Sequence, residues 1–238
     1  IGGGCCNRIS GYGGNVIVGG RKNCSIGYSN NSIVGGLCNC IKDNYANQLF
    51  IGGGFCNHLD SKYGNNNSII GGTKNCIKNI DAGDAISNTT IAGGCLNAAC
   101  SCCVGSAKIS PCGGFIGGGE CNLITNTFDF IVAGQCNKIC YNKARNIGVG
   151  YGEGCSFIIG SKNIVNTGYG TNMIVGHNNC VTSAGGYAGS GRIIGSFSSC
   201  ILGDYGSGGT ILGGSGNSLN QGYGSGGEMI GGSNNTMG

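Results

Sequence analysis

Apolar residues recur along this chain in one phrase, in which an isoleucine is followed by a glycine pair and then by an asparagine. The phrase reads I-V-G-G-L-C-N-C-I at Ile33–Ile41, I-I-G-G-T-K-N-C-I at Ile69–Ile77 and I-L-G-G-S-G-N-S-L at Ile211–Leu219. With the leading residue as position zero, apolar side chains occupy positions zero and eight. Even spacing places both on one face of an extended strand, so the pattern predicts β-strands.

The phrase recurs along the whole chain, mostly at intervals of 15 to 19 residues. Internal repeats of this kind predict a solenoid, in which equal positions of successive coils stack about 4.8 Å apart. We therefore predict an all-β fold, a repetitive parallel β-solenoid of about 14 coils. Its leading residues are Ile1, Ile17, Ile33, Ile51, Ile69, Ile91, Ile116, Ile131, Ile147, Ile158, Ile174, Ile193, Ile211 and Met229.

Two columns of the repeat are predicted to hold the fold. The structural core is expected at Ile17, Ile33, Ile51, Ile69, Ile91, Ile116, Ile131, Ile193 and Ile211. A ladder at position six is expected at Asn7, Asn23, Asn39, Asn57, Asn75, Asn97, Asn122, Asn137 and Asn217. Asparagine tolerates the left-handed turn and bonds locally, and stacked asparagines can bond to one another. Glycine at positions two and three permits positive φ or a close backbone approach.

A third column lies in the segments between the phrases, 11 to 13 residues after each leader. It holds Tyr12, Tyr28, Tyr45, Tyr63, Tyr169, Tyr187, Tyr205 and Tyr223. One interpretation is a structural stack that covers the coil edge. The other is an exposed aromatic stripe that binds sugar rings or a partner surface.

The array is uneven, and we divide it into three parts. Residues 1–146 are Cys-rich repeats, and residues 182–238 are Gly-rich and mostly free of cysteine. Between them, residues 147–181 contain a repeat without the asparagine, led by Ile147, and two repeats that are one residue short, led by Ile158 and Ile174. We interpret this middle part as irregular, compressed coils that form a neck.

Composition excludes several other classes. The chain has 54 glycines and one proline in 238 residues. The glycines do not recur at every third position, which excludes collagen, and glycine disfavours helix by about 1 kcal/mol per residue. The net charge is +4 without a basic block, so no nucleic-acid partner is expected. No apolar run of about 18 residues occurs, so no membrane span is expected.

The 18 cysteines also fall in columns. Cysteines at equal positions of adjacent coils would lie within reach of a disulfide. The candidate pairs are Cys38 with Cys56, Cys121 with Cys136, and Cys24 with Cys40. The insert at 100–112 holds Cys100, Cys102, Cys103 and Cys112 and is expected to be a locally cross-linked knob. Buried thiols are the main alternative. Metal binding is disfavoured because the spacings do not match paired C-x₂-C and only two histidines are present.

Phrases such as GYGGNVIVGGRKN and KYGNNNSIIGGTKNCI resemble the YadA-like head repeats of trimeric autotransporter adhesins. Similar Gly-Gly-x-x-Asn repeats occur in phage and giant-virus fibre proteins. The resemblance implies a left-handed parallel β-roll, a homotrimer, and a role as a surface fibre, stalk or adhesin head. The longer coils and the many cysteines depart from the bacterial heads and favour a virion or other extracellular fibre.

Position one suggests how such a chain associates with itself. It is apolar at Val18, Val34, Ile70, Val132, Ile159, Val175, Ile194, Leu212 and Ile230. Adjacent strand residues point to opposite faces, so this stripe lies outside the coil. We expect it to line the interface between chains.

No catalytic residue, metal ligand or cofactor is predicted. His58 and His177 are interpreted as surface residues, and no Ser-His-Asp order is present. Asp81 and Asp84 are fewer oxygen ligands than Ca²⁺ takes. The sequence thus favours a non-enzymatic structural protein of an extracellular or virion surface fibre, at a cell or virion surface, with its own copies as partners. The alternative is an adhesin or receptor-binding head that contacts host glycan or protein through its loops and tyrosine stripe.

Overall fold

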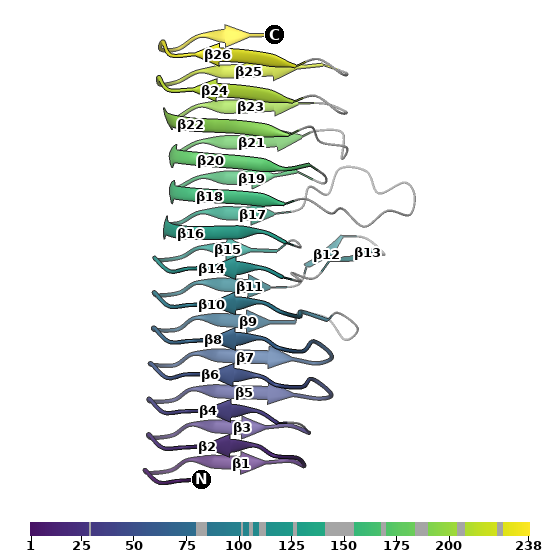
Figure 1. Cartoon of the computed structure of the whole chain (residues 1–238), viewed down its shortest axis with the longest axis vertical. Helices are drawn as coiled ribbons and strands as arrows, with labels where there is room; N and C mark the ends of the chain where they lie inside the picture. The colour runs from purple at the N-terminus through teal and green to yellow at the C-terminus, as the bar shows by residue number, and fades with distance from the viewer. Residues whose placement is uncertain are drawn as a thin grey trace. The chain divides into compact units, whose positions relative to one another are not determined.

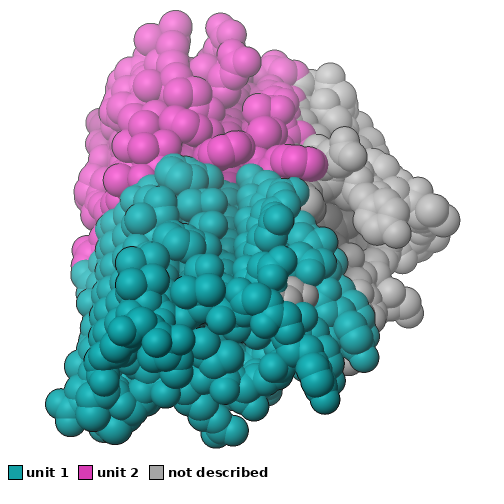
Figure 2. Space-filling model, turned by 60° about the horizontal axis from the view of Figure 1, so that its bottom comes forward, with its two compact units in different colours: residues 1–125 teal, residues 126–238 magenta. Residues whose placement is uncertain are grey.

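The computed structural model describes residues 1–28, 30–79, 85–100, 102–104, 107–109, 113–125, 128–140, 155–167, 170–183, 190–203, 208–222 and 226–238. All regular elements among them are β-strands. The chain forms two compact units, Ile1–Thr125 and Asn126–Gly238 (Figure 2). The predicted boundaries at residues 146/147 and 181/182 are not tested by this division and stay predictions.

Unit 1 winds between two parallel sheets, and each coil contributes one strand to each sheet (Figure 1). The sheet that carries the leading residues, here the leader sheet, contains β2 (Val16–Ile17), β4 (Ser32–Ile33), β6 (Phe50–Ile51), β8 (Ser68–Ile69), β10 (Thr90–Ile91) and β14 (Phe115–Ile116). The second sheet contains β1 (Arg8–Ser10), β3 (Cys24–Ile26), β5 (Cys40–Asp43), β7 (His58–Ser61), β9 (Cys76–Lys78), β11 (Ala98–Cys100) and β15 (Leu123–Ile124).

Unit 2 repeats this arrangement. Its leader sheet contains β16 (Phe130–Gln135), β18 (Ser156–Ser161), β20 (Asn172–His177), β22 (Gly191–Phe197), β24 (Gly209–Leu212) and β26 (Gly227–Ile230). Its second sheet contains β17 (Lys138–Cys140), β19 (Ile164–Asn166), β21 (Cys180–Ser183), β23 (Cys200–Gly203), β25 (Ser218–Gln221) and β27 (Thr236–Met237). The expectation of an all-β parallel solenoid is therefore confirmed.

The core of each unit lies between its two sheets. The predicted core residues from Ile17 to Ile116 pair in register in unit 1, and Ile131, Ile193 and Ile211 lie in the corresponding ladder of unit 2. All of them are fully buried, whereas Ile1 is 64% exposed. Position eight is buried opposite them, as at Ile41 and Leu59.

Positions zero and eight lie on different strands, not on one extended strand as the spacing predicts. Ile33 belongs to β4 of the leader sheet, and Ile41 belongs to β5 of the second sheet. The turn through Gly36, whose φ is +86°, and Cys38, whose φ is +58°, reverses the chain between them. Two buried columns therefore face each other, which closes the core of a two-sheet coil.

The expected coil led by Ile147 is not part of the ladder. β16 pairs directly with β18, and Ile131 lies opposite Ile158. No strand therefore lies between them, and the count of 14 coils is too high at this point. The physical reason is that the Ile147 repeat lacks the position-six asparagine that bonds each coil to the next. Ile147 itself lies outside the described residues.

The short repeats at Ile158 and Ile174 do form coils. They pair residue for residue through six positions. The ladder shifts by one residue on either side of them, between Ile131 and Ala133 and between Val175 and Gly176. The missing residue is thus the one at position two, and a bulge in the neighbouring coil absorbs the difference.

Candidate functional site

The buried asparagines at position six join each coil to the next. The Nδ2 group of Asn57 donates hydrogen bonds to the carbonyl oxygen of Gly53 in its own coil, at 2.8 Å, and of Gly72 in the next coil, at 3.0 Å. Its Oδ1 accepts the N–H of Asn75 at 3.0 Å. The same three bonds occur at Asn7, Asn23, Asn39, Asn75 and Asn97. The ladder is therefore a spine of side chain–backbone bonds.

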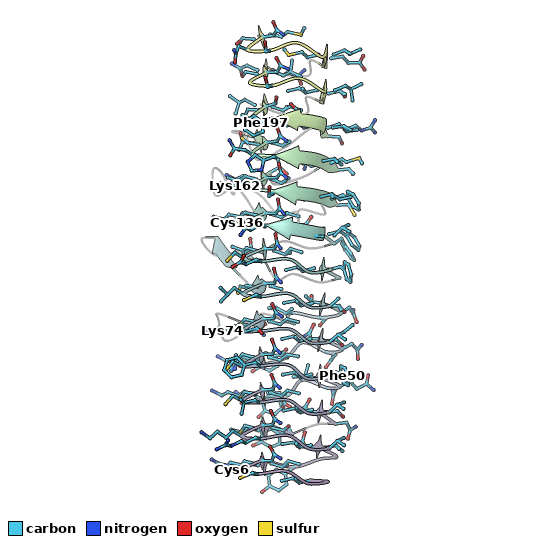
Figure 3. All side chains as sticks on the ribbon, turned by 90° about the vertical axis from the view of Figure 1, so that its left-hand side faces the viewer. Cys6, Phe50, Lys74, Cys136, Lys162 and Phe197 are labelled. Atoms are coloured by element: carbon cyan, nitrogen blue, oxygen red, sulfur yellow. The ribbon has the colours of Figure 1, made fainter. Side chains whose placement is uncertain are left out.

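Most of the asparagines do not bond to one another, and they do not adopt the left-handed conformation themselves. Side chain–side chain bonds occur at Asn122 with Asn97, at 2.9 Å, and at Asn163 with Asn137, at 3.2 Å. The left-handed residue is the one before the asparagine. It is Cys6, Lys22, Cys38, Cys56, Lys74, Leu96, Cys121, Cys136, Lys162, Asn178, Ser198 or Asn234, with φ between 52° and 58°. Cys6 and Lys74 lie on the same edge of unit 1 in Figure 3.

One coil of unit 2 replaces both members of this contact. Ser199 stands at position six in place of asparagine, and Ser196 stands at position three in place of glycine. The two hydroxyls bond to each other, and the Ser196 hydroxyl donates to the carbonyl oxygen of Gly214 in the next coil at 3.3 Å. Ser199 Oγ accepts the N–H of Asn217 at 3.2 Å. The pair of serines thus occupies the space of one asparagine and rebuilds part of its bonds.

The described tyrosines of the third column form a stack on the surface of unit 1. Ring centroids of Tyr12, Tyr28, Tyr45 and Tyr63 are 5.8, 5.6 and 5.8 Å apart in order, within the range of stacked aromatic pairs. Their exposed fractions run from 49% to 75%, so the stack presents ring edges and hydroxyls to solvent. The expected stripe members Tyr169, Tyr187, Tyr205 and Tyr223 lie outside the described residues.

The candidate disulfide cysteines lie at equal positions of neighbouring coils where both are in one unit. Cys24 lies opposite Cys40 in the second sheet, and Cys56 follows Cys38 by one coil at the tight turn. The structure carries these four as thiols. Cys121 belongs to unit 1 and Cys136 to unit 2, so each is described by itself. Disulfide pairing of these cysteines stays a prediction.

The insert contains a short hairpin. β12 (Cys102–Val104) and β13 (Ala107–Ile109) pair antiparallel, with Cys103 opposite Lys108. Cys100 ends β11, whereas the side chains of Cys102 and Cys103 are not described. Cys112, and likewise Asp81 and Asp84 of the earlier loop, lie outside the described residues.

His58 forms a small polar cluster on the outer face of the second sheet of unit 1. It lies opposite Cys40 and Cys76 in the ladder, and its Nε2 is 3.9 Å from Asp60 Oδ2. Asp60 is the largest cause, and Cys40 the second, that raises the pKa of His58 to about 9. His58 lowers the pKa of Asp60 in turn. The two form an ion pair at neutral pH, whose contribution is lost as the pH rises from 6.5 through about 9.

Asp129 is a buried carboxyl in unit 2 and makes the stability of this unit depend on pH. Its Oδ1 accepts the N–H of Ser156 at 2.8 Å, and its Oδ2 has no hydrogen-bond partner among the described residues. Burial raises the pKa of Asp129 to about 8 against the opposing effect of Ser156. Ionisation therefore costs free energy in the folded state. The stability is fully present below about pH 4 and is lost as the pH rises toward 8.

We expect Asp129→Asn to remove this dependence. The amide keeps the acceptor for Ser156 and has no charge to desolvate. At pH 7 the variant should be more stable than the wild type by on the order of 2–4 kcal/mol, and at pH 4 the two should be equal. Urea unfolding of both proteins across this range checks the result. A constant difference between them at every pH would contradict it.

The two outer faces of the coils differ in polarity. The outer face of the leader sheet exposes large apolar side chains immediately before and after the leaders. They are Val16, Val18, Val34 and Ile70 in unit 1, and Phe130, Val132, Ile159, Ile194, Leu212 and Ile230 in unit 2. We call these residues the apolar face; Phe50 lies on the same side of unit 1 (Figure 3). By contrast, the second sheet of unit 1 turns Arg8, Lys42, His58, Asp60 and Lys78 outward.

The described residues provide no metal centre and no helix that could cross a membrane. No group of three or more His, Cys, Asp or Glu side chains is placed to hold a metal ion within them, and none of their segments is a long apolar helix. Comparison with known protein families and with curated proteins gives no match to this chain. The functional argument therefore depends on the surface of the solenoid itself.

Proposed function

We propose that this chain is a non-enzymatic structural component of an extracellular or virion surface fibre, and that it acts as a homotrimer of left-handed β-rolls. The observation that carries the proposal is the apolar face. Soluble monomers rarely expose long contiguous apolar stripes. Here the stripe recurs on every few coils of one sheet, while the second sheet carries charges, so only one face is suited to association.

A parallel assembly of identical chains is the occupant that fits this face best. The exposed residues pair in register from coil to coil, as Ile194 does with Leu212. A second chain with the same repeat would present matching residues at the same spacing. Burial of each such side chain would contribute about 1.5–3 kcal/mol. The sequence resemblance to trimeric heads supports three chains rather than two.

The test is the mass of the protein in solution after charges are placed on this face. Ile194→Asp/Leu212→Asp should convert the trimer to a monomer, because an uncompensated carboxylate in an apolar interface is strongly unfavourable. The matched control is Leu202→Asp/Asn220→Asp, a register pair exposed on the opposite sheet, which should leave the trimer intact. An unchanged mass of Ile194→Asp/Leu212→Asp would reject this interface.

The tyrosine stack supports a second function, that of an adhesin or receptor-binding head. Four exposed rings at regular spacing form a platform on which sugar rings or an extended partner can lie. A glycan array probed with the wild type and with Tyr28→Ala/Tyr45→Ala distinguishes the two functions. Binding that is lost in the variant supports a head, and absence of binding to any glycan or cell surface leaves the structural fibre.

A further inference from the structure

Cys180 and Cys200 form the closest described pair of thiols on neighbouring coils. Cys180 begins β21 and Cys200 begins β23, and the two residues lie directly opposite each other in the parallel ladder. Their Sγ atoms are 2.8 Å apart, closer than two sulfur atoms approach without a bond or hydrogen bond between them. Both side chains are half-buried and reachable from solvent.

The pair lies where the asparagine spine is altered. Cys200 directly follows Ser199, which replaces the position-six asparagine, and Cys180 directly follows Asn179. An asparagine can donate two hydrogen bonds, whereas the hydroxyl of Ser199 can donate one. This coil is therefore joined to its neighbours by a weaker spine, and a covalent link here would act at the step that needs it.

The two thiols are also unequal in reactivity. The S–H of Cys200, and second the hydroxyl of Thr182, hold the pKa of Cys180 down to about 7, against the opposing effect of burial. The same contact raises the pKa of Cys200. Burial instead raises the pKa of Cys24 and raises that of Cys76 to about 12. Cys180 is thus the better nucleophile at neutral pH.

We propose that Cys180 and Cys200 are a modification site that closes to an inter-coil disulfide on contact with a low-molecular-weight disulfide such as oxidised glutathione. The Cys180 thiolate attacks one sulfur of the small disulfide, and one glutathione thiolate leaves. Cys200 loses its proton to that thiolate and attacks Cys180 Sγ, which releases the second glutathione. Two protein thiols are oxidised and one small disulfide is reduced to two thiols. The inference does not depend on the proposed fibre role.

The test uses the full chain and mass spectrometry. The protein is incubated with excess oxidised glutathione, its remaining thiols are blocked with iodoacetamide, and it is then denatured and cut with trypsin without reduction. The flanking cleavage sites, Lys162 and Arg192, release peptides 163–192 and 193–238, which contain Cys180 and Cys200 as their single cysteines. We expect one linked species, lighter by two hydrogens than the sum of the two peptides.

Two serine variants test the order of attack. Ser218 occupies the same column one coil later, so the ladder accepts serine there. Cys200→Ser should accumulate a glutathione adduct on Cys180, and Cys180→Ser should leave Cys200 largely unmodified. Recovery of the wild-type peptides separately, each alkylated, would overturn the proposal. Linkage of either cysteine to a different cysteine would overturn it as well.

Discussion

Gly54→Ala should destabilise unit 1 by on the order of 3 kcal/mol or more, whereas Gly53→Ala should be nearly neutral. Gly54 stands at position three with φ of +91°, where a side chain is strained. A Cβ atom there would overlap the carbonyl oxygen of Gly72 in the next coil and lie 2.7 Å from Asn57 Nδ2. Both neighbours belong to the spine, so neither can move without breaking a hydrogen bond.

Gly53 is the matched control because it is the adjacent glycine of the same turn. A Cβ atom at Gly53 would meet nothing within 4 Å, and alanine loses less backbone entropy on folding than glycine. Urea unfolding of the two variants, followed by circular dichroism, measures the difference. Equal stability of Gly53→Ala and Gly54→Ala would contradict the close coil-to-coil contact on which the fold is built.

Asn57→Ala should cost on the order of 3–4 kcal/mol, because it leaves three buried backbone groups without partners. The carbonyls of Gly53 and Gly72 would lose their donor, and the N–H of Asn75 would lose its acceptor. The site is fully buried, and the tight packing of the turn leaves water little room to replace the amide. The loss should spread to both neighbouring coils.

Asn47→Ala is the comparison for this variant. Asn47 is an exposed asparagine of the same part of unit 1, and its removal should change the free energy of unfolding by less than about 0.5 kcal/mol. Hydrogen exchange should show faster exchange of the Asn75 amide in Asn57→Ala and no change in Asn47→Ala. An Asn57→Ala protein as stable as Asn47→Ala would mean that the spine contributes little.

The parallel solenoid could be predicted from the sequence because stacked coils must repeat what they stack. Ile33, Ile51 and Ile69 recur since each buries the next. The difference between Gly53 and Gly54 could not be predicted, because both read as glycine and only the path of the backbone separates a free position from a crowded one. The same holds for Asn57, whose partners are backbone groups that no sequence pattern displays.

The irregular coils show where repeat counting stops being sufficient. Ile147 matches the leading residue by type, but without a position-six asparagine it adds no strand between β16 and β18. The pair of Cys180 with Cys200 was missed, although both follow position six, because the compressed repeat hid the equal position of Cys180. The paired change to Ser196 and Ser199 was the signal that marked this coil as different, since a β-carbon at position three needs a smaller side chain at position six.

The most direct measurement is electron cryomicroscopy of the untagged full chain, with its mass in solution determined on the same sample. Particles of three parallel chains, with the outer face of the leader sheets turned toward one another, are the result expected of a homotrimeric fibre element. Single-chain particles at every concentration, with the apolar face open to solvent, would contradict the proposed assembly.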